Sequence, residues 1–453
     1  MLARPVLAVS THFPLGVDGS PGVNNARSAG SRLRRPAGEP GPMTNTHPGS
    51  ESHGTDSSSR YEPPSRPRRP SGPAGAAPNS RTSRPAAPRC RVRIGSADAI
   101  LAVVPHLLGF NPADSLVLLG IGGPHARVRL AFRYDLPEPP DVAVAADIAA
   151  HAAAVLGRQR LTTSIAVGYG PGRLVTPVVD VVRPALRRSG IKVHDVLRVE
   201  NDRYWSYLCH DPACCPPDGV RFQAEGHPAA AALSSAGLTV RADRAALAST
   251  LASDESAERL DEAIDRALRR AGELVDAAIS ADDGSDLLQS FADHGRRAVR
   301  VAVTLYRRGG RLTDPDEIAW LGLALTDLRV RDDAWARMDP RFKNAHQRLW
   351  TDLVRRLPAE YVPAPAALLA FTAWQAGDGA LASIAIERAL QADPAYSMAL
   401  LIAEALHAGL PPSAARLPMT PKQVAASYGA RRGTARPPSR RGTEGPGQGG
   451  TGA

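Results

Sequence analysis

The pattern of apolar and polar positions divides the chain into four parts. Residues 1–89 and 412–453 hold few large apolar residues and much Pro, Gly, Ser and Arg. Such segments bury too little apolar surface to offset the entropy lost on ordering, so the pattern predicts disordered tails. Residues 90–225 mix strand and helix periods, and residues 226–411 show helix periods alone. We therefore expect two ordered domains between two disordered tails.

Strand and helix patterns alternate between residues 90 and 225. The continuous apolar runs 115–121 and 164–169 predict strands buried on both faces. The alternating run 127–134 predicts a hairpin partner for the first of them. Helices are predicted over 99–108, 142–156 and 174–188, and further strands over 92–94, 192–199 and 204–208. This order predicts an α/β fold, a mixed sheet layered with helices.

The helical domain is predicted from amphipathic periods over 257–279, 286–307, 316–327 and 342–357. The segment Ala366–Pro394 then places small residues where two helices would cross, Gly377 at the turn and Pro394 after the second helix. This spacing resembles one tetratricopeptide helix hairpin. An ordinary antiparallel helix pair fits equally well, because stacking arrays need about three repeats and one is clear here.

The net charge of +10 belongs to the tails. Residues 1–93 contain 14 Arg and five acidic residues, and residues 408–453 contain seven basic residues and one acidic residue. The segment between them is therefore mildly acidic, with a net charge of −5. Specific nucleic-acid binding by the core is disfavoured, and weak binding of a polyanion by the tails stays open.

Compartment signals point to the cytoplasm. Three of the four cysteines are clustered, which does not make a secreted disulfide framework. The apolar start is too short for a signal peptide, and Met43 is an alternative start of the protein. With no run of about 18 apolar residues, we expect no membrane span.

The stretch Asp202–Pro217 concentrates the candidate chemistry. It holds Cys209, His210, Cys214 and Cys215 in a turn after an aromatic strand. Thiolate and imidazole are the ligands that zinc prefers, so these four residues are the candidate metal ligands. The signal is weaker than a double CxxC pattern, and the vicinal cysteine pair is not a CxxC redox motif. A turn whose cysteines pack as small apolar residues is the structural alternative.

A second candidate site lies at the ends of the predicted strands. Gly168, Gly170 and Gly172 follow one strand and precede a helix, where α/β proteins bind phosphates and other ligands. The loop lacks the Lys-Ser/Thr of a Walker motif, and a plain turn is the simpler interpretation. Asp114 and Asp135 flank neighbouring strands and complete the candidate ligand-binding set.

Three segments carry a family resemblance. Pro105–Val117 (PHLLGFNPADSLV), Arg133–Pro137 (RYDLP) and Arg203–Pro216 (RYWSYLCHDPACCP) resemble an actinobacterial family catalogued as a domain of unknown function. The resemblance covers roughly residues 92–410 and is most specific in the cysteine stretch. It implies a bacterial cytosolic protein and transfers no activity, ligand or catalytic residue.

Together the patterns favour a regulatory or scaffold protein. Its helical domain would bind a protein partner, and its α/β domain would hold a small ligand or a structural metal, with zinc as the candidate cofactor. The first alternative is a hydrolase-type or thiol-dependent enzyme with its site at the Cys209–Cys215 loop. The second is weak polyanion binding through the basic tails.

Overall fold

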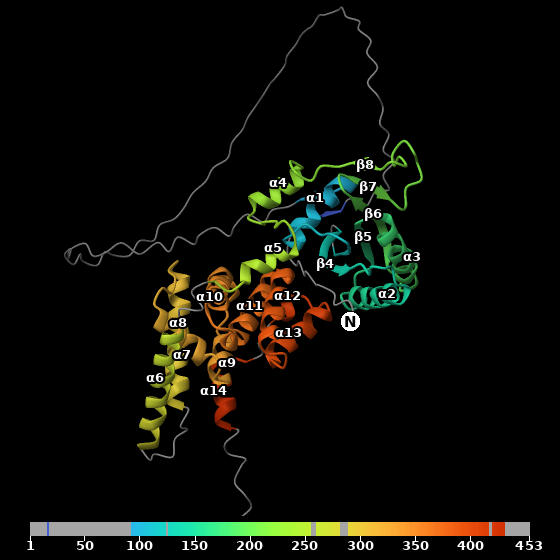
Figure 1. Cartoon of the computed structure of the whole chain (residues 1–453). Coiled ribbons are helices and arrows are strands. Elements are labelled where there is room, and N and C mark those ends of the chain that lie inside the picture. The colour runs from blue at the N-terminus through green and yellow to red at the C-terminus, as the bar shows by residue number, and fades with distance from the viewer. Residues whose placement is uncertain are drawn as a thin grey trace, which may run out of the picture. The chain divides into compact units, whose positions relative to one another are not determined.

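The computed structural model describes residues 16–17, 92–123, 126–254, 260–280, 289–415 and 419–430 (Figure 1). Most of the predicted tails, Met43 and the first residues of the helices predicted from 257 and 286 lie outside these ranges. The strands are β1 (Gly16–Val17), β2 (Arg93–Ile94), β3 (Ser115–Gly122), β4 (Arg127–Asp135), β5 (Thr163–Tyr169), β6 (Lys192–Glu200), β7 (Arg203–Ser206) and β8 (Val220–Arg221).

The strands form one mixed sheet, as the sequence predicts, in the order β2-β1-β4-β3-β5-β6-β7-β8. β3 pairs antiparallel with both β4 and β5, and β5 pairs parallel with β6. The start of β3 therefore lies beside the ends of β4 and β5. Ser115 is opposite Asp135 on one side and opposite Tyr169 on the other.

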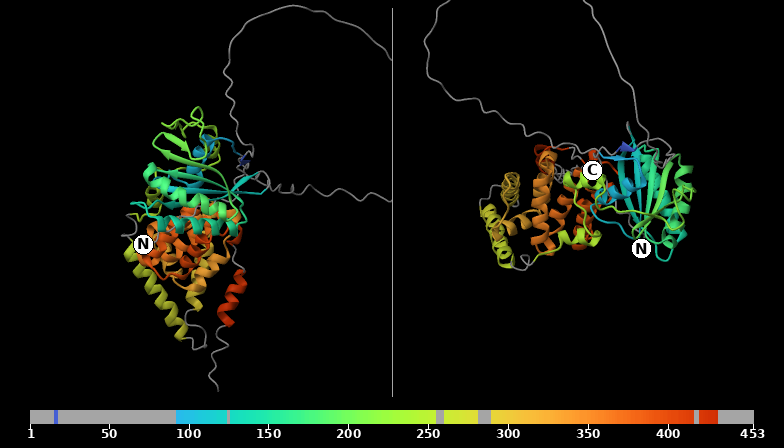
Figure 2. Two further views of the ribbon diagram at one scale, coloured as in Figure 1. Left: turned by 90° about the vertical axis from the view of Figure 1, so that its right-hand side faces the viewer. Right: turned by 90° about the horizontal axis from the view of Figure 1, so that it is seen from above.

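Helices cover both faces of the sheet (Figures 1 and 2). Leu116 and Leu118 of β3 belong to the core that contains α2 (Val142–Arg158) and α3 (Gly172–Arg188). The alternate residues Val117 and Leu119 belong to a second core, formed with α1 (Ala97–Leu108) and α4 (Pro228–Ser235). Since successive strand residues point to opposite faces, burial on both faces explains why β3 is free of polar side chains from Leu116 to Ile121.

Local signals fix the ends of several helices. The Ser96 side chain accepts a hydrogen bond from the Ala99 N–H at the start of α1, and Gly109 ends that helix with a positive φ of 78°. Asp141 caps α2 through the N–H groups of Ala143 and Val144. These are the residue types expected at helix starts and ends, so the predicted ranges lie close to the observed ones.

The remaining described helices follow the sheet in the chain. They are α5 (Arg244–Ala248), α6 (Asp261–Ser280), α7 (Gln289–Arg307), α8 (Pro315–Ala324), α9 (Leu328–Ala336), α10 (Lys343–Arg356), α11 (Pro363–Ala376), α12 (Gly379–Ala392), α13 (Ser397–His407) and α14 (Pro421–Ala430). None of the described helices is both long and apolar enough to cross a lipid bilayer.

Helices α11 and α12 form the helix pair predicted around Gly377. Gly377 has a φ of +84° at the end of α11, and Asp378 caps α12 by accepting a hydrogen bond from the Leu381 N–H (3.0 Å). Every residue of α11 from 363 to 374 is buried. A helix that is buried all round is a core helix, so α11 itself does not present the exposed groove of a peptide-binding repeat.

Two short segments depart from the predicted disorder of the tails. β1 pairs in parallel with β2 and contacts β4 at Arg127. In the C-terminal tail, α14 begins with a capping box in which Thr420 and Gln423 exchange hydrogen bonds. Val424 is buried, and the Tyr428 hydroxyl donates to the carboxylate of Asp332 in α9 (2.5 Å). Burial of Val424, the capping box and the Tyr428–Asp332 hydrogen bond offset the conformational entropy that this segment loses on ordering.

His151, which has no evident partner in the sequence, joins α2 to the end of α13. The Tyr134 hydroxyl lies 2.7 Å from His151 Nδ1, and His151 Nε2 lies 2.8 Å from the His407 carbonyl oxygen. Because a carbonyl only accepts, Nε2 carries the proton and Nδ1 accepts from the tyrosine. Burial is the main cause that lowers the pKa of His151, which favours this neutral form.

The fold predicts a loss of stability in acid. His346 on α10 is 2% exposed, and burial lowers its pKa to about 4. Above the unfolded-state pKa of about 6.5, both states are neutral and His346 adds no pH dependence. As the pH falls from about 6.5 to 4, the unfolded state takes up the proton first, and the free energy of unfolding is expected to decrease by about 3 kcal/mol from this residue.

Urea unfolding at pH 7 and pH 4.5 checks this prediction. His346→Gln removes the titrating group, so the variant is expected to lose less stability between the two pH values than the wild type. His210→Gln changes an exposed histidine and is expected to lose as much as the wild type. An equal loss in all three proteins would contradict the assignment to His346.

Candidate functional site

The cysteine stretch forms the tip of the hairpin between β7 and β8. The predicted strand 204–208 ends earlier, at Ser206, whose Oγ accepts hydrogen bonds from the N–H groups of Leu208 and Cys209 (3.2 Å each). These bonds satisfy two backbone N–H groups just after the strand, while the Tyr207 N–H still donates to the Val196 carbonyl of β6 (2.9 Å). The aromatic and apolar residues continue to Tyr207 and Leu208, which is why the sequence predicted a longer strand than the observed β7.

The base of the hairpin holds the loop in place. The Trp205 indole N–H donates to the Pro217 carbonyl (2.9 Å), and Arg203 Nη1 donates to the carbonyls of Asp218 and Gly219 (2.9 and 2.8 Å). Gly219 has a φ of +78°, and a Cβ added there would lie 2.6 Å from the Trp205 ring. Only glycine fits this close contact without a shift of the ring.

A tight turn inside the loop brings the three cysteines together. The N–H groups of Cys214 and Cys215 both donate to the Asp211 carbonyl (3.1 and 2.7 Å), and the Asp211 carboxylate accepts from the Ala213 N–H (2.9 Å). The Sγ atoms of Cys209, Cys214 and Cys215 lie within 4.8 Å of one another. Among the described residues this is the one group of three or more Cys, His, Asp or Glu side chains arranged to hold a metal ion.

His210 and the cysteines differ in their placement. Cys209 and Cys215 are half-buried and Cys214 is exposed, and all three have free thiols. His210 is exposed and is not part of the group of ligand atoms within 4.8 Å. The structure therefore assembles three of the four predicted metal ligands and leaves the imidazole out of the cluster.

The thiols differ in acidity. A hydrogen bond from the Asp211 backbone, followed by one from Cys215, lowers the pKa of Cys209. Burial, followed by its hydrogen bonds with the other two cysteines, raises the pKa of Cys215 to about 12. One thiolate thus forms first and is stabilised by its neighbours, and binding of a metal ion would release the remaining protons.

The predicted glycine loop is shaped by packing. A Cβ added at Gly168 would lie 2.2 Å from Val175 of α3, so this glycine lets the helix approach the sheet closely. The N–H of Gly170 donates to the Val199 carbonyl (2.8 Å), and Pro171 has no N–H. The loop therefore offers few free backbone donors to a phosphate group.

The same loop meets the two predicted carboxylates at one edge of the sheet. Gly170 has a φ of +128°, and a Cβ there would lie 2.9 Å from Asp114 Oδ1. Asp135 of β4 lies opposite Ser115 of β3, and its carboxylate forms an ion pair with Arg133. Residues far apart in sequence are adjacent here because β3 is antiparallel to both of its neighbours.

Arg198 connects the glycine loop to the base of the cysteine hairpin. A Cβ added at Gly172 would lie 2.8 Å from Arg198 Nη1, which donates to Glu200 (2.8 Å). The Arg198 guanidinium lies over Trp205, with Cζ 3.8 Å from the ring centroid. The contact is a cation–π interaction, and it makes the two predicted sites neighbours on the sheet.

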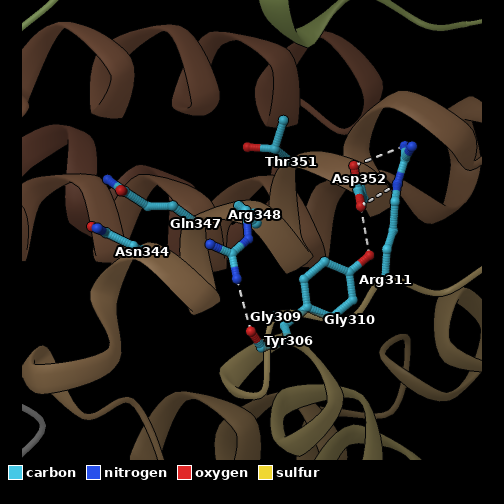
Figure 3. A pocket seen from close by; sticks show the side chains of 9 residues that line it. All are labelled: Tyr306, Gly309, Gly310, Arg311, Asn344, Gln347, Arg348, Thr351 and Asp352. Carbon is cyan, nitrogen blue, oxygen red and sulfur yellow. Dashed lines mark hydrogen bonds and ion pairs between the residues drawn. The ribbon is translucent and has the colours of Figure 1, made fainter. Parts of the chain in front are cut away.

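A hollow of 640 Å³ in the helical part has no counterpart in the sequence analysis (Figure 3). Tyr306 and Arg311 both bind Asp352, through Oη–Oδ2 and Nε–Oδ2 distances of 2.5 and 2.8 Å. Arg348 donates to the Tyr306 carbonyl (2.8 Å). The charged groups are largely paired with one another. Arg311 and Asp352 are 41 positions apart in the chain, so no local sequence pattern would reveal their contact.

Comparison with known proteins gives one finding. The profile of a protein family described as a domain of unknown function (DUF4192) matches residues 98–413, well over half of the chain. No curated protein and no solved structure matches the chain significantly. The matched range contains Asp114, Asp135, the glycine loop 168–172 and the whole cysteine hairpin.

The acidities predict an order of thiol reactivity in metal-free protein. The thiolate is the reactive form, so Cys209 is expected to be alkylated before Cys215, since a thiol of pKa about 12 is ionised to roughly one part in 100,000 at pH 7. Short iodoacetamide pulses at pH 7, followed by peptide mass spectrometry, measure the order. Equal rates for the two residues would show that the hydrogen bonds do not separate their acidities.

Proposed function

Because the chain belongs to the DUF4192 family, whose function is unknown, we propose a function from its own residues: it is a zinc-binding regulatory protein. The ion is held by Cys209, Cys214 and Cys215. The observation that carries the proposal is the convergence of three Sγ atoms within 4.8 Å of one another in a loop fixed by backbone hydrogen bonds.

The sulfur spacing supports zinc. A tetrahedral ion with Zn–S bonds of about 2.3 Å separates its sulfur ligands by about 3.8 Å. The Sγ atoms of Cys214 and Cys215 are 3.9 Å apart. The adjacent cysteines therefore reach one ion with little rearrangement, and the turn at Asp211 brings them back toward Cys209.

The fourth coordination position supports regulation. Three thiolates give a zinc centre a net charge of −1, which weakens the ability of the ion to polarise a bound water. An open position on such a centre is better suited to binding an exchangeable small ligand than to hydrolysis. Its location on the exposed hairpin tip, with Cys214 at the surface, leaves it accessible to such a ligand.

The proposal includes a cellular location and a partner. Thiols stay reduced, and free for the ion, in the cytoplasm. We place the protein there, and we assign the protein partner to the helical part of the chain, at a surface other than the buried helix α11.

A thiol-dependent enzyme is the second candidate function. The observation that favours it is the lowered pKa of Cys209, because reactive cysteines are those whose thiolate is stabilised. In that case the loop would carry no ion, and Cys209 would be the nucleophile.

Metal analysis of the full-length protein tests the proposal. Purified without chelator, it is expected to contain about one zinc per chain, and Cys209→Ser, Cys214→Ser and Cys215→Ser are each expected to lose most of it on dialysis against a chelator. Cys90→Ser, at the fourth cysteine of the chain, is the matched control and is expected to retain the ion. Chelation is expected to lower the free energy of unfolding by about 3 kcal/mol when free zinc had been at a hundred times its Kd.

Two results would contradict the proposal. If the wild type holds no zinc, copper or iron and its three thiols titrate freely, the metal site is wrong and the enzyme candidate gains. If the Cys90 variant loses zinc as readily as the other three, the ion is not specific to the hairpin.

A further inference from the structure

Three buried side chains at the edge of the sheet carry polar atoms without a hydrogen-bond partner among the described residues. They are the Arg133 guanidinium at Nε and Nη1, the Ser115 hydroxyl and the Tyr169 hydroxyl. The Arg133 side chain is 7% exposed, and Ser115 is fully buried. Buried donors are normally satisfied, and each one left unpaired costs about 1–3 kcal/mol, so this group calls for an acceptor.

The strand register places the three side chains on one face. Ser115 is directly opposite Tyr169 on β5, and Arg133 is opposite Val117, two residues further along β3. Residues directly opposite have Cβ atoms about 5 Å apart, and diagonal neighbours lie about 7–8 Å apart. Val117 and Tyr169 belong to the core with α1, so Ser115 and Arg133, which share their face, point the same way.

One side of the group is formed by the segment that follows α1. The Arg133 Cζ is 5.8 Å from the ring centroid of Phe110. This segment is itself fixed, because the Asn111 N–H donates to the Arg241 carbonyl (3.0 Å) and the Arg241 N–H donates to the Gly109 carbonyl (2.9 Å). The donors thus stand in a rigid frame, as a binding site requires.

All the unpaired groups can donate. A guanidinium has only donors, and burial raises the pKa of Tyr169, so its phenol keeps its proton. A cluster of one cation and two neutral hydroxyl groups matches the oxygens of a carboxylate or phosphoryl group.

We propose that Arg133, Tyr169 and Ser115 form a binding site for a small ligand that carries an oxyanion, and that Asp135 occupies the arginine when the ligand is absent. The Asp135 carboxylate accepts the ion pair from Arg133 Nη2, yet its side chain is 56% exposed. It therefore lies on the solvent-exposed side of the buried donors, where an incoming oxyanion would replace it. The exposed residues Asn111 and Asp114 flank the same edge.

The role given to Asp135 makes the test sharp. If it competes with the ligand for Arg133, Asp135→Asn removes the competing charge and is expected to raise the affinity about tenfold. Arg133→Gln is expected to lower it by about 10- to 100-fold, the range for the loss of one charge-assisted hydrogen bond. Tyr169→Phe, which keeps the ring and removes the hydroxyl, is expected to lower it by about threefold to tenfold.

The experiment is calorimetric titration of the full-length protein with sodium acetate and, separately, inorganic phosphate, at constant ionic strength set with chloride. Heat with acetate identifies a carboxylate ligand, and heat with phosphate alone identifies a phosphoryl ligand; either supports the site if the variants shift as stated. Arg129→Gln, an exposed arginine on the same strand, is the matched control and is expected to bind like the wild type.

Three outcomes would overturn the proposal. Neither anion binds to the wild type or to Asp135→Asn at millimolar concentration, which would leave ordered water as the partner of the donors. Alternatively, Asp135→Asn binds no more tightly than the wild type. Finally, Arg129→Gln weakens binding as much as Tyr169→Phe does. If Arg133→Gln does not fold, the Asp135 and Tyr169 variants decide the question.

Discussion

The antiparallel pairing of β3 with both β4 and β5 is the constraint on which the functional geometry depends. It places the start of one strand beside the ends of two others, so residues 114–115, 133–135 and 168–170 meet at a single edge. β3 is buried on both faces, and a register shift of one residue would exchange its two apolar faces between different cores. The positions of residues 114–115, 133–135 and 168–170 are therefore set by the same register that forms the two cores.

Much of the fold follows from patterns that act locally. The apolar run of β3, the alternation of β4 and the caps Ser96 and Asp141 determine their elements through near neighbours in the chain, and the structure confirms a mixed sheet with helices. The departures depend on distant partners. α14 is held partly by the contact of Tyr428 with Asp332, and β1 exists only as a partner of β2 and β4, so composition alone predicted disorder for both.

The candidate sites show the same division. The three cysteines are close in sequence. Asp and Pro are residues that favour turns, and the turn at Asp211-Pro212 is enough to bring the cysteines together. Asp114, Asp135 and Gly170 were predicted as members of one candidate ligand-binding set, and the strand register shows how they come to lie at the same end of the strands. Arg133, Ser115 and Tyr169 escaped prediction because an alternating strand pattern does not reveal that a polar residue on the buried face lacks a partner.

The central claim is that three thiolates of one hairpin bind a single zinc ion. X-ray absorption at the zinc edge, measured on the full-length protein as purified, tests it most directly. The account predicts a first shell of three sulfur atoms at about 2.3 Å and one nitrogen or oxygen atom. A shell of nitrogen and oxygen atoms alone would contradict it, because the ion would then be bound elsewhere and the cysteine cluster would have another purpose.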